Sequence, residues 1–232
     1  MSGTSLIGLV GGMSWQSTAL YYRKLNERVE ARLGAHHNAR CLINTVDFED
    51  LLAPAMSGDW DAAARVLAEV AQRLERAGAE VIALTSVTGH FAAQHVRDLI
   101  SGPFVDMGGA VGEELQRRKV RSFACLGTKK TLSGGFFVEP MRDNFGIEFV
   151  RPSDVEIECV NSVIIDELTR GVFDPGSKKR ILEIAEALRE RGAQVVVLAC
   201  TELPLLVADS SEIGFLDVVD AHVDAILDRA LA

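Results

Sequence analysis

The sequence lacks the features of proteins that bind nucleic acids or membranes. Its 24 Lys and Arg residues are outnumbered by 33 Asp and Glu residues, which leaves a formal net charge of −9. Nucleic acids and anionic membranes attract basic surfaces, so we expect neither as a partner. No apolar run approaches the 18 residues of a membrane span, and no cationic leader opens the chain, so we expect a cytoplasmic location.

Cysteine is scarce, and nucleotide-binding motifs are missing. The four cysteines form no Cys-x-x-Cys pair and have no His beside them at ligand spacing, so we expect reduced thiols and no metal site. Neither the Gly-x-Gly-x-x-Gly fingerprint nor the Gly-Lys-Ser/Thr of a P-loop occurs. A nucleotide cofactor is therefore not expected.

The sequence does contain a regular alternation of strand-like and helix-like segments. Apolar residues recur at helical spacing in three long segments, Gln16–Leu33, Trp60–Ala77 and Ser177–Arg191. Short apolar runs predict buried strands at Leu6–Val10, Arg40–Val46, Glu80–Leu84, Arg121–Leu126, Ile147–Val150 and Gln194–Ala199. Such runs alternating with helices predict the α/β class, with parallel sheets covered by helices.

An internal repeat divides the chain into two halves. Leu74–Ser86 resembles Leu188–Cys200 at an offset of 114 residues, and Leu6–Gly12 resembles Ser122–Thr128 at an offset of 116. The repeat predicts two pseudo-symmetric parallel-sheet domains with an active-site cleft between them. We expect residues 1–104 and 212–232 to form the first domain, and residues 105–211 the second.

The repeat makes Ser86 and Cys200 equivalent residues at the carboxyl ends of two strands, where parallel α/β sheets bind ligands. Facing each other, they could remove a proton from one side of a carbon and return it to the other. Each precedes an expected helix start, whose backbone N–H groups would lower a thiol pKa and bind a carboxylate. Both residues also fit a structural role, as a small buried Cys and a turn-capping Ser.

Other polar residues follow the expected strand ends. Gly11–Thr18 opens a helix, where it would bind an anion or form a tight turn. Thr128 and Thr131 hold the equivalent place in the second half and would bind a carboxylate or cap a helix. His90 lies one helical turn after Ser86, and His222 is a further candidate, although a lone His is more often structural.

These residues resemble the aspartate/glutamate racemase family. Ile7–Thr18 with Tyr21–Arg23 is similar to the family's opening motif, and Leu198–Leu203 is similar to its second catalytic cysteine motif. Further matches in order and spacing are Asn44–Phe48, Leu126–Thr131, Asp166–Leu168 with Gly171, and Phe215–Asp217 with His222. The resemblance implies two α/β domains, a homodimer, an amino-acid or dicarboxylate substrate, no cofactor, and catalysis by two facing thiols.

The first catalytic motif departs from the family pattern. Where the family has Cys-Asn-Thr followed by His after one residue, this chain reads Ser86-Val87-Thr88-Gly89-His90. A branch of the family carries a hydroxyl residue at the first position, but Val87 lacks the amide that contacts substrate in relatives. Thr169 also stands where the family often has a lysine, which affects recognition of a distal carboxylate.

We therefore expect a cofactor-independent racemase of aspartate, glutamate or a related amino acid, with Cys200 and Ser86 as its two bases. The expected substrate-binding residues are Gly12, Met13, Ser14, Val87, Thr88, Thr128, Thr131, Thr201 and Glu202, with His90 and Asn44 as further candidates. Two alternatives stay open. One is a single-thiol decarboxylase or isomerase of the arylmalonate type, and the other is a catalytically impaired ligand-binding homologue.

Overall fold

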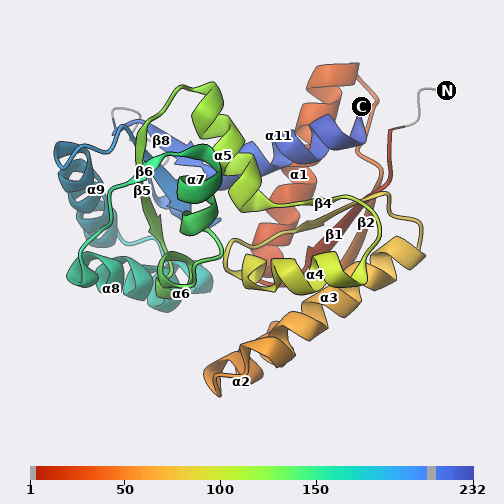
Figure 1. Ribbon diagram of the computed structural model, residues 1–232, viewed down its shortest axis with the longest axis horizontal. Coiled ribbons are helices and arrows are strands. Elements are labelled where there is room, and N and C mark those ends of the chain that lie inside the picture. Colours follow the sequence, from red (N-terminus) through yellow and green to blue (C-terminus); the bar gives the residue numbers. More distant parts are fainter. Residues whose placement is uncertain (1–3, 208–212) are drawn as a thin grey trace. The chain divides into compact units, whose positions relative to one another are not determined.

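Parallel strands form two sheets in the computed structural model, which describes residues 4–207 and 213–232 (Figure 1). The chain divides into two compact units. Unit 1 contains the residues up to Asp106 and those from His222 to Ala232, and unit 2 contains Met107–Ala221. The predicted α/β class with two parallel-sheet domains is confirmed.

Unit 1 has the strand order β2-β1-β3-β4, and every pair is parallel. Its strands are β1 (Ile7–Gly11), β2 (Cys41–Thr45), β3 (Val81–Leu84) and β4 (Phe104–Val105). Its helices are α1 (Trp15–Leu33), α2 (Phe48–Met56), α3 (Trp60–Arg76), the 3-10 turn η1 (Thr88–Ala92) and α4 (Ala93–Leu99). The helix α11 (Val218–Ala230) begins in unit 2, and its residues from His222 onward belong to unit 1.

Unit 2 repeats this arrangement with the strand order β6-β5-β7-β8. Its strands are β5 (Ser122–Gly127), β6 (Glu148–Phe149), β7 (Val195–Ala199) and β8 (Phe215–Asp217). Its helices are α5 (Met107–Arg117), α6 (Lys129–Ser133), α7 (Val138–Phe145), α8 (Asp154–Ser162), the π-turn η2 (Val163–Glu167), η3 (Leu168–Arg170), α9 (Pro175–Glu190) and α10 (Leu203–Val207).

The pairing of the strands shows the same internal repeat as the sequence. Ile7 of β1 pairs with Val81 of β3, and Phe123 of β5 pairs with Val195 of β7. Phe123 follows Ile7 by 116 residues, and Val195 follows Val81 by 114 residues. These are the two offsets at which the sequence repeats. Ser86 and Cys200 therefore follow equivalent strands of the two units.

The repeat extends to the helices that build the cores. In unit 1, α3 buries Leu67, Ala71 and Leu74, residues spaced by four and three so that they share one helix face. In unit 2, α9 buries Ile181, Ala185 and Leu188, each 114 residues further along the chain. The same apolar stripe therefore covers each sheet and holds β3 and β7 at comparable places.

Two strands and both domain boundaries differ from the sequence-based expectation: unit 1 extends to Asp106 instead of residue 104, and its second segment begins at His222 instead of residue 212. The apolar runs predicted six strands correctly. They did not predict β4 and β8, where only two apolar residues stand together, Phe104–Val105 and Phe215–Leu216. Because β8 pairs with β7, residues 213–221 belong to unit 2, whereas the sequence grouped residues 212–232 with the first domain. Within residues 4–207 and 213–232, each helix is too short or too polar to cross a bilayer.

Candidate active site

In unit 1 the turn after β1 has a backbone that requires glycine. Gly12 has a φ of +93°, and a Cβ atom there would overlap the main-chain oxygen of Val46. The Gly12 N–H donates to Thr18 Oγ1 at 3.0 Å, and Ser14 Oγ accepts the N–H of Ser17 at 3.1 Å as the N-cap of α1. The expected anion-binding segment is thus the start of α1, with Met13 almost buried beside it.

A buried hydroxyl network joins this turn to the end of β3. The Ser17 hydroxyl donates to the main-chain oxygen of Thr85, and Thr18 Oγ1 lies 3.1 Å from Thr85 Oγ1. Thr85 Oγ1 donates to the Val10 carbonyl at 3.2 Å. These bonds fix the residue that precedes Ser86. Sequence reasoning missed Thr85, because its partner Thr18 is 67 residues away in the chain.

Ser86 lies two residues before the first residue of η1 and is almost buried, with 8% of its surface exposed. Its Oγ accepts the N–H of Gly89 at 3.1 Å. Met13 packs on the same turn, since a Cβ on Gly89 would lie 2.6 Å from Met13 Sδ. Val87 is buried and Thr88 is half-buried. The hydroxyl of Ser86 is therefore held in a defined direction by its bond to the Gly89 N–H.

His90 and His222, which were two separate candidates in the sequence, lie together in unit 1. Their ring centroids are 5.5 Å apart, and both side chains are buried. His90 Nδ1 lies 2.7 Å from the Ser86 main-chain oxygen, so the ring contacts the backbone of Ser86. Burial lowers the pKa of His90, and burial together with His90 lowers the pKa of His222 to about 3. Both rings are therefore neutral near pH 7.

In unit 2, Thr128 and Thr131 lie beyond the end of β5. Thr128 is the N-cap of α6, where its Oγ1 accepts the Thr131 N–H at 3.2 Å, and the two hydroxyl oxygens are 3.0 Å apart. Gly127 of β5 pairs with Ala199 of β7. Since Thr128 and Cys200 directly follow these paired residues, they lie at the same edge of the sheet.

Cys200 is buried beside a carboxylate. Its Sγ donates to Glu202 Oε2 at 3.1 Å, and Thr201 Oγ1 donates to the same oxygen at 2.6 Å. Burial and the charge of Glu202 raise the pKa of the Cys200 thiol well above its usual value, although the N–H groups of Glu202 and Leu203 oppose this. The expectation of a lowered thiol pKa is wrong, because loss of solvation outweighs the backbone donors.

The remaining expected residue, Asn44, lies on β2 opposite Val10 and is half-buried.

In the described ranges, 4–207 and 213–232, no three His, Cys, Asp or Glu side chains are placed to hold a metal ion. The strand ends of unit 1 thus carry hydroxyl groups around Ser86. Those of unit 2 carry hydroxyl groups and a thiol next to a carboxylate that can accept its proton.

Comparison with known proteins identifies the family. The chain is 33% identical to a candidate Asp/Glu racemase from Yersinia pestis, whose crystal structure superimposes with a TM-score of 0.92 over 98% of this chain and 100% of that one. It is also 26% identical over 148 residues to the glutamate racemase of Deinococcus radiodurans, a match that covers 63% of this chain and 48% of that relative. The chain thus spans about half the length of that relative.

The fold also occurs in an arylmalonate decarboxylase, with a TM-score of 0.52 at 13% identity over 98% of this chain and 92% of that one. The family model described as Asp/Glu/Hydantoin racemase matches residues 10–226. That match includes both sheets and every strand end discussed above except the beginning of β1. The chain therefore belongs to the Asp/Glu/Hydantoin racemase family.

Proposed function

We propose that this protein is a cofactor-independent amino-acid racemase, with Cys200 and Ser86 acting on the two faces of a substrate α-carbon. The observation that carries the proposal is the equivalence of the two residues in a duplicated fold, each following the same strand of its unit. Family membership supports racemase chemistry. The names of the relatives support aspartate, glutamate or a related amino acid as substrate.

The proposed reaction begins with transfer of the Cys200 proton to Glu202 Oε2, which lies 3.1 Å from the sulfur. The resulting thiolate accepts the α-proton of the substrate. The Ser86 hydroxyl then protonates the carbanion on its other face and is left as an alkoxide, which takes a proton from solvent while Glu202 releases the proton it had accepted. The backbone of Gly12–Ser14 and the hydroxyls of Thr128, Thr131 and Thr201 would bind the substrate carboxylate.

The two faces should react at unequal rates. A serine hydroxyl is a far weaker acid than a thiol, whose reference pKa is about 8.5. Protonation by Ser86 is therefore slower than return of a proton from Cys200 to the same face. We expect exchange of the α-proton with solvent to outrun inversion of configuration.

Incubation with each enantiomer of aspartate and glutamate in heavy water tests the proposal, with deuterium uptake and chirality measured on the same samples. Cys200→Ser should abolish both exchange and inversion, and Ser86→Ala should reduce inversion while exchange continues. Ser86→Cys should speed inversion, because it supplies a second thiol. Cys159 is a half-buried cysteine of α8, so Cys159→Ser is the matched control and should behave as wild type.

Two results would contradict this assignment. Absence of exchange and inversion with every amino acid would remove the racemase proposal. Full exchange in Cys200→Ser together with loss of exchange in Ser86→Ala would reverse the roles of the two residues.

A second candidate is a single-thiol decarboxylase. The observation that favours it is the unequal chemistry of the strand ends, a thiol in unit 2 and a hydroxyl beside the buried Val87 in unit 1. One acid suffices to protonate an enolate on a single face. Release of carbon dioxide from aryl-substituted malonates, without inversion of amino acids, would support it. Thermal stabilisation by dicarboxylic amino acids without either reaction would instead indicate a ligand-binding homologue.

A further inference from the structure

Three aromatic side chains form a buried polar cluster in unit 1, and the proposed reaction uses none of them. Tyr21 of α1 and His222 of α11 have no exposed surface, and His90 of η1 has 1%. The Tyr21 hydroxyl lies 2.8 Å from His222 Nδ1, and the His222 ring meets the His90 ring edge to face. Burying imidazole groups is costly unless their nitrogens form hydrogen bonds. We call the two histidines, His90 and His222, together with Tyr21 the imidazole cluster.

The surroundings determine where the protons lie. A main-chain carbonyl can only accept, so His222 Nε2 must carry the proton that bonds to the Val105 oxygen at 2.9 Å. In the neutral ring Nδ1 is then an acceptor, and it receives the Tyr21 hydroxyl proton. By the same argument His90 Nδ1 carries a proton and donates it to the Ser86 oxygen at 2.7 Å. Each ring is therefore held in one tautomer.

These contacts hold Ser86 from two sides. Its carbonyl receives the His90 Nδ1–H, while its Oγ receives the Gly89 N–H at 3.1 Å. The His90 ring itself is confined between Phe104, at 5.9 Å between ring centroids, and His222, at 5.5 Å. A change in the His90 donor would free the carbonyl of Ser86 and with it the turn that directs the Ser86 hydroxyl.

We propose that His90 is a positioning residue for Ser86, and that Tyr21 and His222 keep its ring in place. The inference rests on the proposed function in one respect, the assignment of Ser86 to the second face of the substrate. The hydrogen-bond geometry of the turn does not depend on that assignment. The two can therefore be tested separately.

The test compares His90→Asn with His90→Leu. The asparagine amide nitrogen occupies the place of Nδ1 and can still donate to the Ser86 carbonyl, whereas leucine has a similar volume and no donor. We expect His90→Leu to lower inversion roughly ten- to a hundredfold, a typical effect of misplacing a reacting group. Exchange of the α-proton through Cys200 should continue, so the ratio of inversion to exchange falls. His90→Asn should restore most of that ratio.

A second measurement does not need activity. Hydrogen exchange of the Gly89 amide, followed by NMR, reports the bond to Ser86 Oγ, and Ser86→Ala gives the value for the broken bond. We expect His90→Leu to lose Gly89 protection and His90→Asn to keep it. If His90→Leu does not fold, His90→Gln provides the contrast, because its amide nitrogen lies at the place of Nε2 instead of Nδ1.

The outcomes distinguish the two ideas. Wild-type Gly89 protection in His90→Leu, or equal behaviour of the Leu and Asn variants, would overturn the positioning role. If Ser86→Ala inverts substrates as fast as wild type, the proposed role of Ser86 in catalysis fails. In that case the Gly89 protection still decides whether His90 holds the turn.

Discussion

At the scale of single residues, the charge state of Cys200 follows from the groups around its sulfur. Burial and the negative charge of Glu202 both favour the neutral thiol, and the N–H groups of Glu202 and Leu203 favour the thiolate. The first pair of effects is larger, so the thiol is the resting form at neutral pH. Glu202 therefore has two consequences: it disfavours the thiolate, and it offers a nearby acceptor for the proton.

Removing the charge of Glu202 should make Cys200 more acidic. In Glu202→Gln the unfavourable charge is lost, so we predict that alkylation of Cys200 by iodoacetamide begins at lower pH than in wild type. Peptide mass spectrometry can follow Cys200 against Cys159 in the same sample. The control is Glu158→Gln, an exposed residue of α8. An unchanged or higher alkylation midpoint in Glu202→Gln would contradict this account.

The turn at Gly12 should be more sensitive to substitution than other left-handed glycines. Gly34 has a φ of +101° but open space around it, so Gly34→Ala meets only backbone strain of about 1–3 kcal/mol. Gly12→Ala adds the overlap with the Val46 main chain. We predict a larger loss in the free energy of unfolding for Gly12→Ala, measured by urea denaturation. Equal losses would show that the turn can relax away from Val46.

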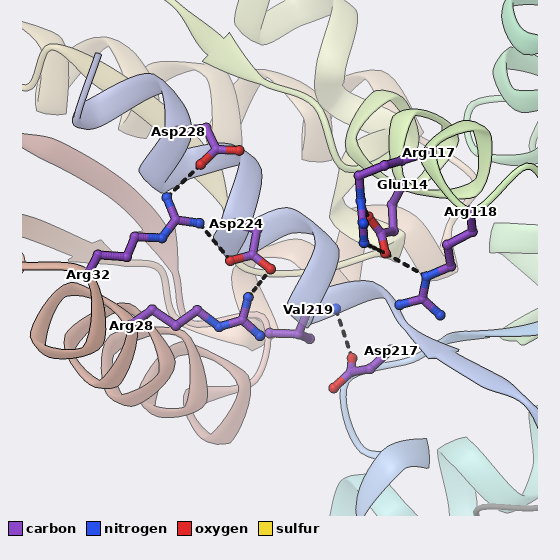
Figure 2. Close-up of polar contacts among 9 residues, drawn as sticks. All are labelled: Arg28, Arg32, Glu114, Arg117, Arg118, Asp217, Val219, Asp224 and Asp228. Atoms are coloured by element: carbon purple, nitrogen blue, oxygen red, sulfur yellow. Dashed lines mark hydrogen bonds and ion pairs between the residues drawn. The ribbon is translucent and has the colours of Figure 1, made fainter.

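At the scale of elements, α11 is attached to α1 by two kinds of contact. Figure 2 shows Arg28 and Arg32 reaching toward Asp224 and Asp228; Arg32 pairs with Asp224 at 2.9 Å and with Asp228 at 2.5 Å. These side chains are partly or largely exposed, and such pairs are typically worth about 0–1 kcal/mol each. The bond between Tyr21 and His222 is buried, so its loss should cost more.

Substitutions on α1 and α11 can rank these contacts. Tyr21→Phe leaves the buried His222 Nδ1 without its donor, and we predict a loss of about 1–3 kcal/mol in the free energy of unfolding. Asp224→Asn should cost no more than about 1 kcal/mol, and less at high salt. Tyr22→Phe is a matched control, because Tyr22 is half exposed on the same helix. A larger effect for Asp224→Asn than for Tyr21→Phe would reverse the ranking.

At the scale of the whole molecule, the imidazole cluster should make the fold sensitive to acid. The pKa of His222 is about 3 in the folded protein, against an ordinary value of 6.5, and that of His90 is lowered as well. The unfolded chain therefore binds more protons than the folded one between pH 6.5 and about 3. The free energy of unfolding must fall with falling pH in this range, by up to about 1.4 kcal/mol per pH unit for each such histidine.

Urea midpoints measured from pH 7 down to pH 4 test this linkage. We predict a shallower pH dependence for His222→Gln, which removes one of the two buried imidazoles, than for wild type. His37→Gln, in the exposed loop before β2, should retain the wild-type slope. Carboxylates contribute to the pH dependence of wild type and of both variants. The contribution of His222 is therefore read from the difference in slope between wild type and His222→Gln. Identical slopes would mean that His222 does not contribute.

The sequence by itself determined six strands (β1, β2, β3, β5, β6 and β7), the two-unit repeat and the strand-end location of Ser86, Cys200, Thr128 and Thr131. These features are local: apolar periodicity predicts an element from its own residues, and the two offsets align the halves without knowledge of contacts. The strands β4 and β8 were missed because each contains only two consecutive apolar residues, Phe104–Val105 and Phe215–Leu216, and the boundary before β8 was misplaced with them.

Only the tertiary structure decided the surroundings of the candidate site residues. Thr85 meets Thr18 across 67 residues, and His222 meets Tyr21 across 201, distances in sequence at which no local pattern identifies a partner. The pKa of Cys200 shifted opposite to the sequence-based expectation for the same reason. A helix start is visible in the sequence, but the loss of solvent around a thiol depends on packing from the whole unit, and here that loss is the larger effect.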